Sequence, residues 1–242
     1  MNTKKENAIK LCEELNTLFN QASPQEVLTY ANDRFKTKLV LASSLGLEDQ
    51  LLTSYLCQIN PQARIFVLDT GRLNKETYDV METTKQTYNM SYEVYQPNPQ
   101  AIDVFIKTKG LDSFYESLAN RKECCKIRKI DPLRRVLATA DAWITGLRKE
   151  QSQNRQAMSL FEYDDAHELI KINPLIKWTY EDVFKEVKKQ NIPYNVLHDK
   201  GYPSIGCEPC TRAIKPGEDF RAGRWWWENE DKKECGLHMG KD

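Results

Sequence analysis

A chain of 242 residues with 40% hydrophobic and 29% charged residues has the composition of a globular protein and can bury a sizeable core. Its 35 basic and 35 acidic residues cancel, so overall charge gives no reason to expect binding to nucleic acid or to a membrane surface. The N-terminal residues 1–16 lack the apolar core of a signal peptide, and no apolar run approaches the roughly 18 residues of a membrane span. We therefore expect a cytoplasmic protein whose seven cysteines serve a metal or catalysis rather than disulfides.

The first segments are predicted to be helical. Apolar residues recur every three or four positions over residues 9–19, which places them on one face of a helix. The stretch SPQE then supplies Ser23 as N-cap, Pro24 at the first helical position and Glu26 for a capping box. Cys12 belongs to the apolar face, so we expect it in the core.

From residue 39 onward, short apolar runs alternate with helical patterns. Strands are predicted at 39–42 and within 63–71, 91–97 and 142–146, and helices at 51–59, 74–88, 131–140 and 180–191. Thr179 and Asp182 are expected to cap the last helix. The alternation predicts an α/β fold with a mainly parallel sheet and flanking helices. We expect a single domain over residues 1–242, in which residues 193–242 form a loop-rich C-terminal extension.

Three polar loops each follow a predicted strand: SSLGLED at 43–49, LDTGRL at 68–73 and TGLRKEQ at 145–151. Ligands bind beyond the carboxyl ends of parallel strands, so these loops should converge on one cleft. In the first loop, Gly46 permits a close turn, while the hydroxyls of Ser43 and Ser44 and the next helix N-terminus favour an anion. The loop is not a Walker motif, and a plain N-cap turn is the alternative.

Four cysteines form the strongest motif. KECCKIRK contains the adjacent pair Cys124 and Cys125, and IGCEPCTR contains Cys207 and Cys210. Four thiolates from two segments suit either a structural zinc ion or a [4Fe–4S] cluster. Adjacent cysteines are unusual in tetrahedral zinc sites, so the pattern favours the cluster over zinc, and either over four unrelated thiols.

Basic residues are concentrated near these loops and cysteines. They are Lys126, Arg128, Lys129, Arg148, Lys149, Arg155, Arg221 and Arg224. Any one alone would be interpreted as a solvated surface charge, but together they favour a substrate with several anionic oxygens. Trp225, Trp226 and Trp227 are expected to pack and to anchor the end of the chain, with stacking of one of them on a base as the alternative.

Cys235 lies in the terminal stretch KECGLHMGKD. Chain ends are poorly ordered unless something holds them. A reactive thiol in this position could visit one site, react, and then visit another. An incidental exposed cysteine is the alternative from this stretch alone.

Several of these stretches together resemble one family. They are SSLGLED, LDTGRLNKETYD, ECCKIRK, TGLRKEQS, GYPSIGCEPCTR, GRWWWE and KECGLH. Over residues 40–238 the chain resembles the assimilatory sulfonucleotide reductases, and more closely their iron–sulfur branch, the adenylyl-sulfate (APS) reductases. The resemblance implies an adenine-nucleotide α-hydrolase-like sheet.

The resemblance also implies the chemistry. The Cys235 thiolate would attack the sulfur of APS and expel AMP, leaving an S-sulfocysteine. Thioredoxin or glutaredoxin would then release sulfite from that adduct, as a step of assimilatory sulfate reduction and cysteine biosynthesis. His238 matches the family's tail histidine, with positioning or acid–base help as its expected role and an exposed bystander as the alternative.

Site residues follow from the same resemblance. Cys124, Cys125, Cys207 and Cys210 would hold one [4Fe–4S] cluster per chain. The residues expected at the substrate are Ser43, Ser44, Gly46, Asp69, Thr70, Gly71, Lys129, Gly146, Arg148, Arg155, Arg221 and Arg224.

Three alternatives remain. The first loop is closer to the serine-rich loop of the 3′-phosphorylated (PAPS) reductases than to a Ser-Gly-Ala-Glu-Asp form, so strict preference for APS is not implied, and a PAPS reductase or a reductase of both nucleotides is the alternative. A zinc-bound nucleotide sensor is more remote and leaves Cys235 unexplained. An ATP pyrophosphatase would need a Ser-Gly-Gly-x-Asp-Ser loop, which the sequence lacks. The sequence leaves open the reductant, the role of residues 1–35 and the oligomeric state, a homo-oligomer included.

Overall fold

Six short apolar stretches pair into one sheet, in the order β3-β2-β1-β4-β6-β5. The computed structural model describes residues 3–151 and 155–228. All neighbouring strands are parallel except β5, which pairs antiparallel with β6 at the sheet edge. The predicted α/β fold with a mainly parallel sheet is confirmed. The strands are β1 Leu39–Ser43, β2 Arg64–Leu68, β3 Glu93–Tyr95, β4 Ala142–Ile144, β5 Phe161–Asp164 and β6 Leu169–Ile172.

Four helices, α2, α5, α6 and α8, begin at side-chain caps. Ser23 and Glu26 form the expected capping box at α2, and Thr179 and Asp182 form another at α8, which satisfies backbone N–H groups that the first turn leaves unpaired. The helices are α1 Thr3–Leu18, α2 Pro24–Phe35, α3 Leu47–Ile59, α4 Lys75–Tyr88, α5 Pro99–Lys109, α6 Leu118–Cys125, α7 Asp131–Leu137 and α8 Tyr180–Lys189. Within the described ranges, none of them is long and apolar enough to cross a bilayer.

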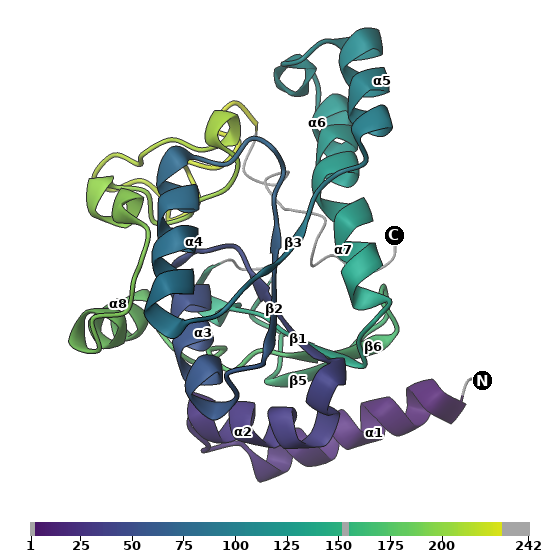
Figure 1. Cartoon of the computed structure of the whole chain (residues 1–242), viewed down its shortest axis with the longest axis vertical. Coiled ribbons are helices and arrows are strands. Elements are labelled where there is room, and N and C mark those ends of the chain that lie inside the picture. Colours follow the sequence, from purple (N-terminus) through teal and green to yellow (C-terminus); the bar gives the residue numbers. More distant parts are fainter. Residues whose placement is uncertain (1–2, 152–154, 229–242) are drawn as a thin grey trace.

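The two faces of the sheet are covered unequally, with α3, α4 and α8 on one side and α6 and α7 on the other (Figure 1). Alternate strand residues point to opposite faces. Leu39 and Leu41 join a large core with α1, α2, α3, α4 and α8, in which Cys12 is buried as expected. Val40 and Phe66 join a smaller core against α7. The central strands β1, β2, β4 and β6 are therefore buried on both sides, as expected for parallel strands.

Several parts of the fold were not predicted. The hairpin of β5 and β6 and the helices α5 and α6 are absent from the expected elements, although Asn98 and Ser117 cap these helices with their side chains. In addition, residues Lys126–Ile130 form a π-helical segment that joins α6 to α7 without a break. Such segments are rare and occur frequently at functional sites.

The chain after α8 follows the carboxyl edge of the sheet in short turns. It includes 3₁₀ turns at Val196–Lys200 and Glu208–Cys210. Cys207 forms an isolated antiparallel bridge with Leu73, and the Glu208 N–H donates to the Arg72 carbonyl at 2.8 Å. These bonds bring the CxxC motif to the loop after β2.

Candidate active site

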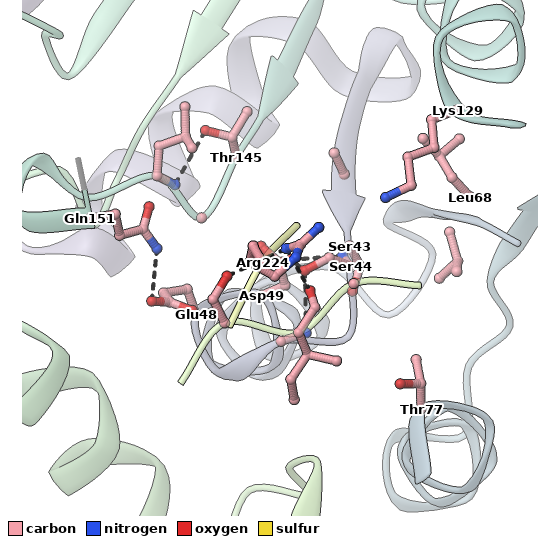
Figure 2. A pocket seen from close by; sticks show the side chains of 18 of the residues that line it. Ser43, Ser44, Glu48, Asp49, Leu68, Thr77, Lys129, Thr145, Gln151 and Arg224 are labelled. Atoms are coloured by element: carbon pink, nitrogen blue, oxygen red, sulfur yellow. Dashed lines mark hydrogen bonds between the residues drawn. The ribbon is translucent and has the colours of Figure 1, made fainter. Parts of the chain in front are cut away.

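A cavity of about 220 Å³ opens at the carboxyl ends of β1, β2 and β4. The connections from β1 lead to β2 on one side, and β4 lies on its other side, so this is the switch point where nucleotides bind in open parallel sheets. The loops after all three strands contribute to the cavity wall, as does the C-terminal extension (Figure 2). Of the expected substrate residues, those that line it are Ser43, Ser44, Gly46, Thr70, Lys129, Gly146, Arg155, Arg221 and Arg224.

Asp49 organises the loop after β1. One of its carboxylate oxygens accepts hydrogen bonds from the Ser44 N–H at 2.7 Å and from the Ser44 hydroxyl at 2.6 Å. Burial raises the pKa of Asp49 to about 7, against the opposing effect of the Ser44 bonds. Asp49 therefore acts as the internal acceptor that fixes the shape of the loop.

Gly146 is needed for close approach, and Gly46 does not have an unusual backbone angle. Gly46 has φ −78°, and the left-handed residue of the loop is Leu45, at φ 61°. The expected turning role of Gly46 is thus taken by its neighbour, whose side chain is buried. A Cβ atom on Gly146 would lie 2.3 Å from a carboxylate oxygen of Asp49. Only glycine allows the loops after β1 and β4 to meet so closely.

Arg148 does not reach the cavity wall, in contrast to its expected substrate contact. Its guanidinium is fully buried and donates to Glu48 at 2.8 Å and to Glu150 at 2.6 Å. Glu48 also accepts from the Gln151 amide at 3.0 Å, a bond drawn in Figure 2. Two carboxylates thus offset the charge of Arg148.

Asp69 and Gly71 also lie beside the cavity rather than on its wall. The Asp69 carboxylate accepts the Gly71 N–H at 2.9 Å, the Tyr78 hydroxyl at 2.8 Å and the Gln96 amide at 3.1 Å. These bonds shape the turn after β2, so that Thr70 faces the cavity. Gly71 supplies a left-handed angle, φ 69°, in the same turn.

His198 is a wall residue that the sequence reasoning missed. It is buried, and neither of its ring nitrogens has a hydrogen-bond partner among the described residues. Both nitrogens have almost no exposed surface, so the ring forms part of the wall without presenting a nitrogen to the cavity. The signal available was its position in HDKGYPSIGC, just before the CxxC motif.

A second, smaller cavity is lined by all four expected cluster cysteines, Cys124, Cys125, Cys207 and Cys210. Successive residues of an α-helix point about 100° apart, and Cys124 and Cys125 close α6 just where the π-helical segment begins. The Thr70 hydroxyl lies 3.2 Å from the Cys207 sulfur. The two segments that carry the cysteines therefore meet at one place.

The surroundings of these thiols are strongly basic. Arg72, Arg121, Arg128 and Lys129 share the cavity wall with the cysteines. Burial raises the pKa of Cys207, but Lys129, the Thr70 hydroxyl and nearby arginines outweigh it and the net shift is downward. Burial raises the pKa of Cys210 to about 11.

The arrangement of the four thiols differs from that of a mononuclear site. Among the described residues, no three His, Cys, Asp or Glu side chains are grouped closely enough to hold one metal ion. A [4Fe–4S] cluster spreads four cysteine ligands over its irons, so its ligands stand farther apart than those of a single zinc ion. Lys129 lines both this cavity and the larger one. Cys235 and His238 lie outside the described residues.

Comparison with known proteins identifies the family. The sequence profile of the phosphoadenosine phosphosulfate reductase domain matches residues 38–213, which is most of the chain. The chain belongs to the phosphoadenosine phosphosulfate reductase family. The expected resemblance to sulfonucleotide reductases is confirmed.

Individual members of this family and more distant proteins agree with the assignment. An adenosine 5′-phosphosulfate reductase from Allochromatium vinosum is 50% identical over 200 residues, which cover 83% of this chain and 78% of that protein. The crystal structure of a phosphoadenylyl-sulfate (PAPS) reductase from Candida auris, a phosphate complex, has a TM-score of 0.72 at 28% identity and covers 84% of this chain and 96% of that one. An FMN adenylyltransferase from Candida glabrata has a TM-score of 0.54 at 14% identity, covers 98% of this chain and 88% of that one, and shares the fold alone. The adenine-nucleotide α-hydrolase-like fold is confirmed.

Proposed function

We propose that this chain reduces adenosine 5′-phosphosulfate to sulfite and AMP, in the cytoplasm, as a step of sulfate assimilation. The name of the Allochromatium vinosum relative supports the substrate. The observation that carries the proposal is that Lys129 lines both the cavity at the switch point and the cavity of four cysteines. Arg155, Arg221 and Arg224 line the former, and guanidinium groups are suited to the oxygens of a phosphosulfate.

A [4Fe–4S] cluster is the cofactor that the cysteine cavity fits best. The donor set consists of four thiols from two segments, and arginine and lysine side chains around them would offset the negative charge of thiolate-bound iron. When bound, the cluster would tie the two segments together and add its charge beside Lys129. The proposed ligands of the cluster are Cys124, Cys125, Cys207 and Cys210. None of these cysteines takes part in the proposed reaction steps.

Cys235 is the proposed nucleophile. Its thiolate attacks the sulfur of the phosphosulfate, an S–S bond forms, and the S–O bond to the phosphate breaks so that AMP leaves with the electron pair. A thiolate of thioredoxin or glutaredoxin then attacks the cysteine sulfur, and sulfite leaves with the electrons of the S–S bond. The second thiol of the reductant resolves the mixed disulfide, so the reductant supplies both electrons. His238 is proposed to assist the Cys235 thiol.

The covalent intermediate provides the test. Incubation with APS and no reductant should add one sulfo group to Cys235, visible by intact mass and peptide mapping, and thioredoxin should remove it. Cys235→Ser should abolish sulfite release while leaving AMP binding and iron content unchanged. Cys57→Ser is the matched control, because Cys57 is a buried core thiol. An adduct on Cys12 or Cys57, or turnover by Cys235→Ser, would contradict the proposal.

Reduction of PAPS is the second candidate function. The profile that matches the chain is named for phosphoadenosine phosphosulfate reductase, and the Candida auris structure is a PAPS reductase. The two substrates differ by one 3′-phosphate, which would need additional cationic contacts. The family fold and the thiol chemistry are common to both candidates.

A further inference from the structure

A buried ion pair holds the chain just before its terminal stretch. Arg121, on α6, donates to both carboxylate oxygens of Glu228, at 2.9 and 2.8 Å. The two side chains are only 2% and 7% exposed. A bidentate Arg–carboxylate pair fixes both distance and orientation, so Glu228 has a defined position relative to α6.

One aromatic ring packs directly against this pair. The Arg121 guanidinium lies 4.5 Å from the ring centroid of the buried Trp225, and the backbone N–H of Trp225 donates to the Cys210 carbonyl at 3.2 Å. Farther along the same stretch, the Trp227 ring lies 4.4 Å from that of Tyr115. The expected packing role of the tryptophans is confirmed for Trp225, whereas Trp226 remains exposed.

Arg121 belongs to the cysteine cavity, and the segment that carries Glu228 leads from the larger cavity. Arg121 lines the cysteine cavity together with Cys125, and Arg224, four residues before Glu228, lines the larger cavity. Cys235 follows Glu228 by seven residues.

Buried ion pairs are a weak source of stability, because the loss of hydration offsets much of the attraction between the charges. Their best-attested use is to specify one arrangement among several. The Arg121–Glu228 pair lies just before the segment that carries the proposed nucleophile. It could therefore specify the direction in which that segment leaves the fold. We propose that Arg121 and Glu228 form an anchor that positions the terminal segment so that Cys235 reaches the substrate cavity. This inference rests on the proposed function of Cys235.

The test separates positioning from stability. In single turnover with saturating APS and no reductant, Glu228→Ala should form the Cys235 adduct about 10- to 100-fold more slowly than the wild type, since misplacement of a reacting group by about 1 Å costs this much. Glu228→Ala leaves Arg121 buried without its partner, so the melting temperature should fall, whereas AMP affinity and iron content per folded chain should stay unchanged at the assay temperature. The reaction of Cys235 with iodoacetamide in the absence of nucleotide should keep its rate, because the thiol itself is not altered. Glu228→Gln, which retains the side-chain volume and one acceptor, should give a smaller decrease.

Glu218→Ala is the matched control. Glu218 accepts two bonds from Arg212, at 2.8 and 3.0 Å, in the same extension, and its loss should leave adduct formation unchanged. Two results overturn the anchor: adduct formation at the wild-type rate in both Glu228 variants, or a parallel loss of AMP affinity and iron, which would mark a purely structural pair. If the wild type itself forms no adduct on Cys235, the proposed function fails, and the wild-type measurement shows this separately.

Discussion

At the residue scale, the buried Asp49 side chain determines the shape of the loops after β1 and β4. Its carboxylate accepts hydrogen bonds from Ser44, and it lies where a Cβ atom at position 146 would clash. An acidic group on the wall of an anion site is unfavourable for the ligand, so its function is to shape the loop rather than to contact phosphate. The motif SSLGLED shows a loop suited to an anion, but only the fold shows which of its residues faces inward.

The raised pKa of Asp49 predicts a pH dependence of stability. Its pKa is 3.8 in an unfolded chain and about 7 in the folded protein, so the folded state binds more protons between these values. The contribution of Asp49 to the free energy of unfolding is therefore fully present below pH 4, and it is lost as the pH rises toward 7. Asp49→Asn should flatten this part of the profile, measured as the melting temperature from pH 4 to 8.

Asp33→Asn is the control for that measurement, because Asp33 is exposed and its substitution should preserve the wild-type slope. A wild-type melting temperature that rises steadily from pH 4 to 7, with the same slope in Asp49→Asn, would show that Asp49 is ionised throughout. The loop would then be held by a charged rather than a protonated carboxyl group.

At the scale of elements, short sequence motifs predicted those features that depend only on residues close together in the chain. Both capping boxes were predictable because their partners are three residues apart. The π-helical segment after Cys125 was not, because nothing in KIRKI distinguishes a π turn from an α turn. The hairpin of β5 and β6 was missed because strands this short depend on their neighbours in the sheet more than on intrinsic preference.

The joining of two distant elements at the cysteine cavity predicts the outcome of cysteine substitutions. Ser at Cys124, Cys125, Cys207 or Cys210 should remove both iron and activity, because each thiol is proposed to hold one corner of the cluster. Anaerobically purified wild type should be brown, with about four irons per chain. Cys12→Ser should retain the iron, because Cys12 belongs to the core around α1. Colourless protein with one tightly bound zinc per chain would instead favour the nucleotide sensor.

At the scale of the whole molecule, the site could be predicted as a set of segments but not as a set of contacts. The loops after β1, β2 and β4 converge as parallel topology requires. Arg148, however, was expected at the substrate and is buried against Glu48. The prediction failed because sequence periodicity does not show which basic side chain forms an ion pair with a carboxylate far away in the chain. His198 was missed for the complementary reason, since its place in the cavity wall depends on the path of the C-terminal extension.

The charge distribution around the cavity predicts the preferred nucleotide. Glu48 and Asp49 lie on its wall, and Glu48 and Glu150 offset the charge of Arg148, so fewer cations face an additional phosphate than the sequence suggests. We expect a higher kcat/KM for APS, with measurable turnover of PAPS, in steady-state assays of both nucleotides under the same conditions. A much higher kcat/KM for PAPS would show that the second candidate function is the principal one.

The unequal covering of the sheet has a consequence for how the molecule opens. Regions with fewer buried apolar contacts unfold locally at a lower free energy, as separate cooperative units. On the side of α7 the core is small, whereas the opposite core includes five helices. We therefore expect backbone amides of α7 to exchange with solvent through openings of lower free energy than those of α3, and α6 is continuous with α7 through the π-helical segment. Because α6 carries Cys124 and Cys125, a bound cluster would link α6 to the CxxC segment on the side of the sheet with the smaller core. Oxidative loss of the cluster would then cause local unfolding to begin on that side.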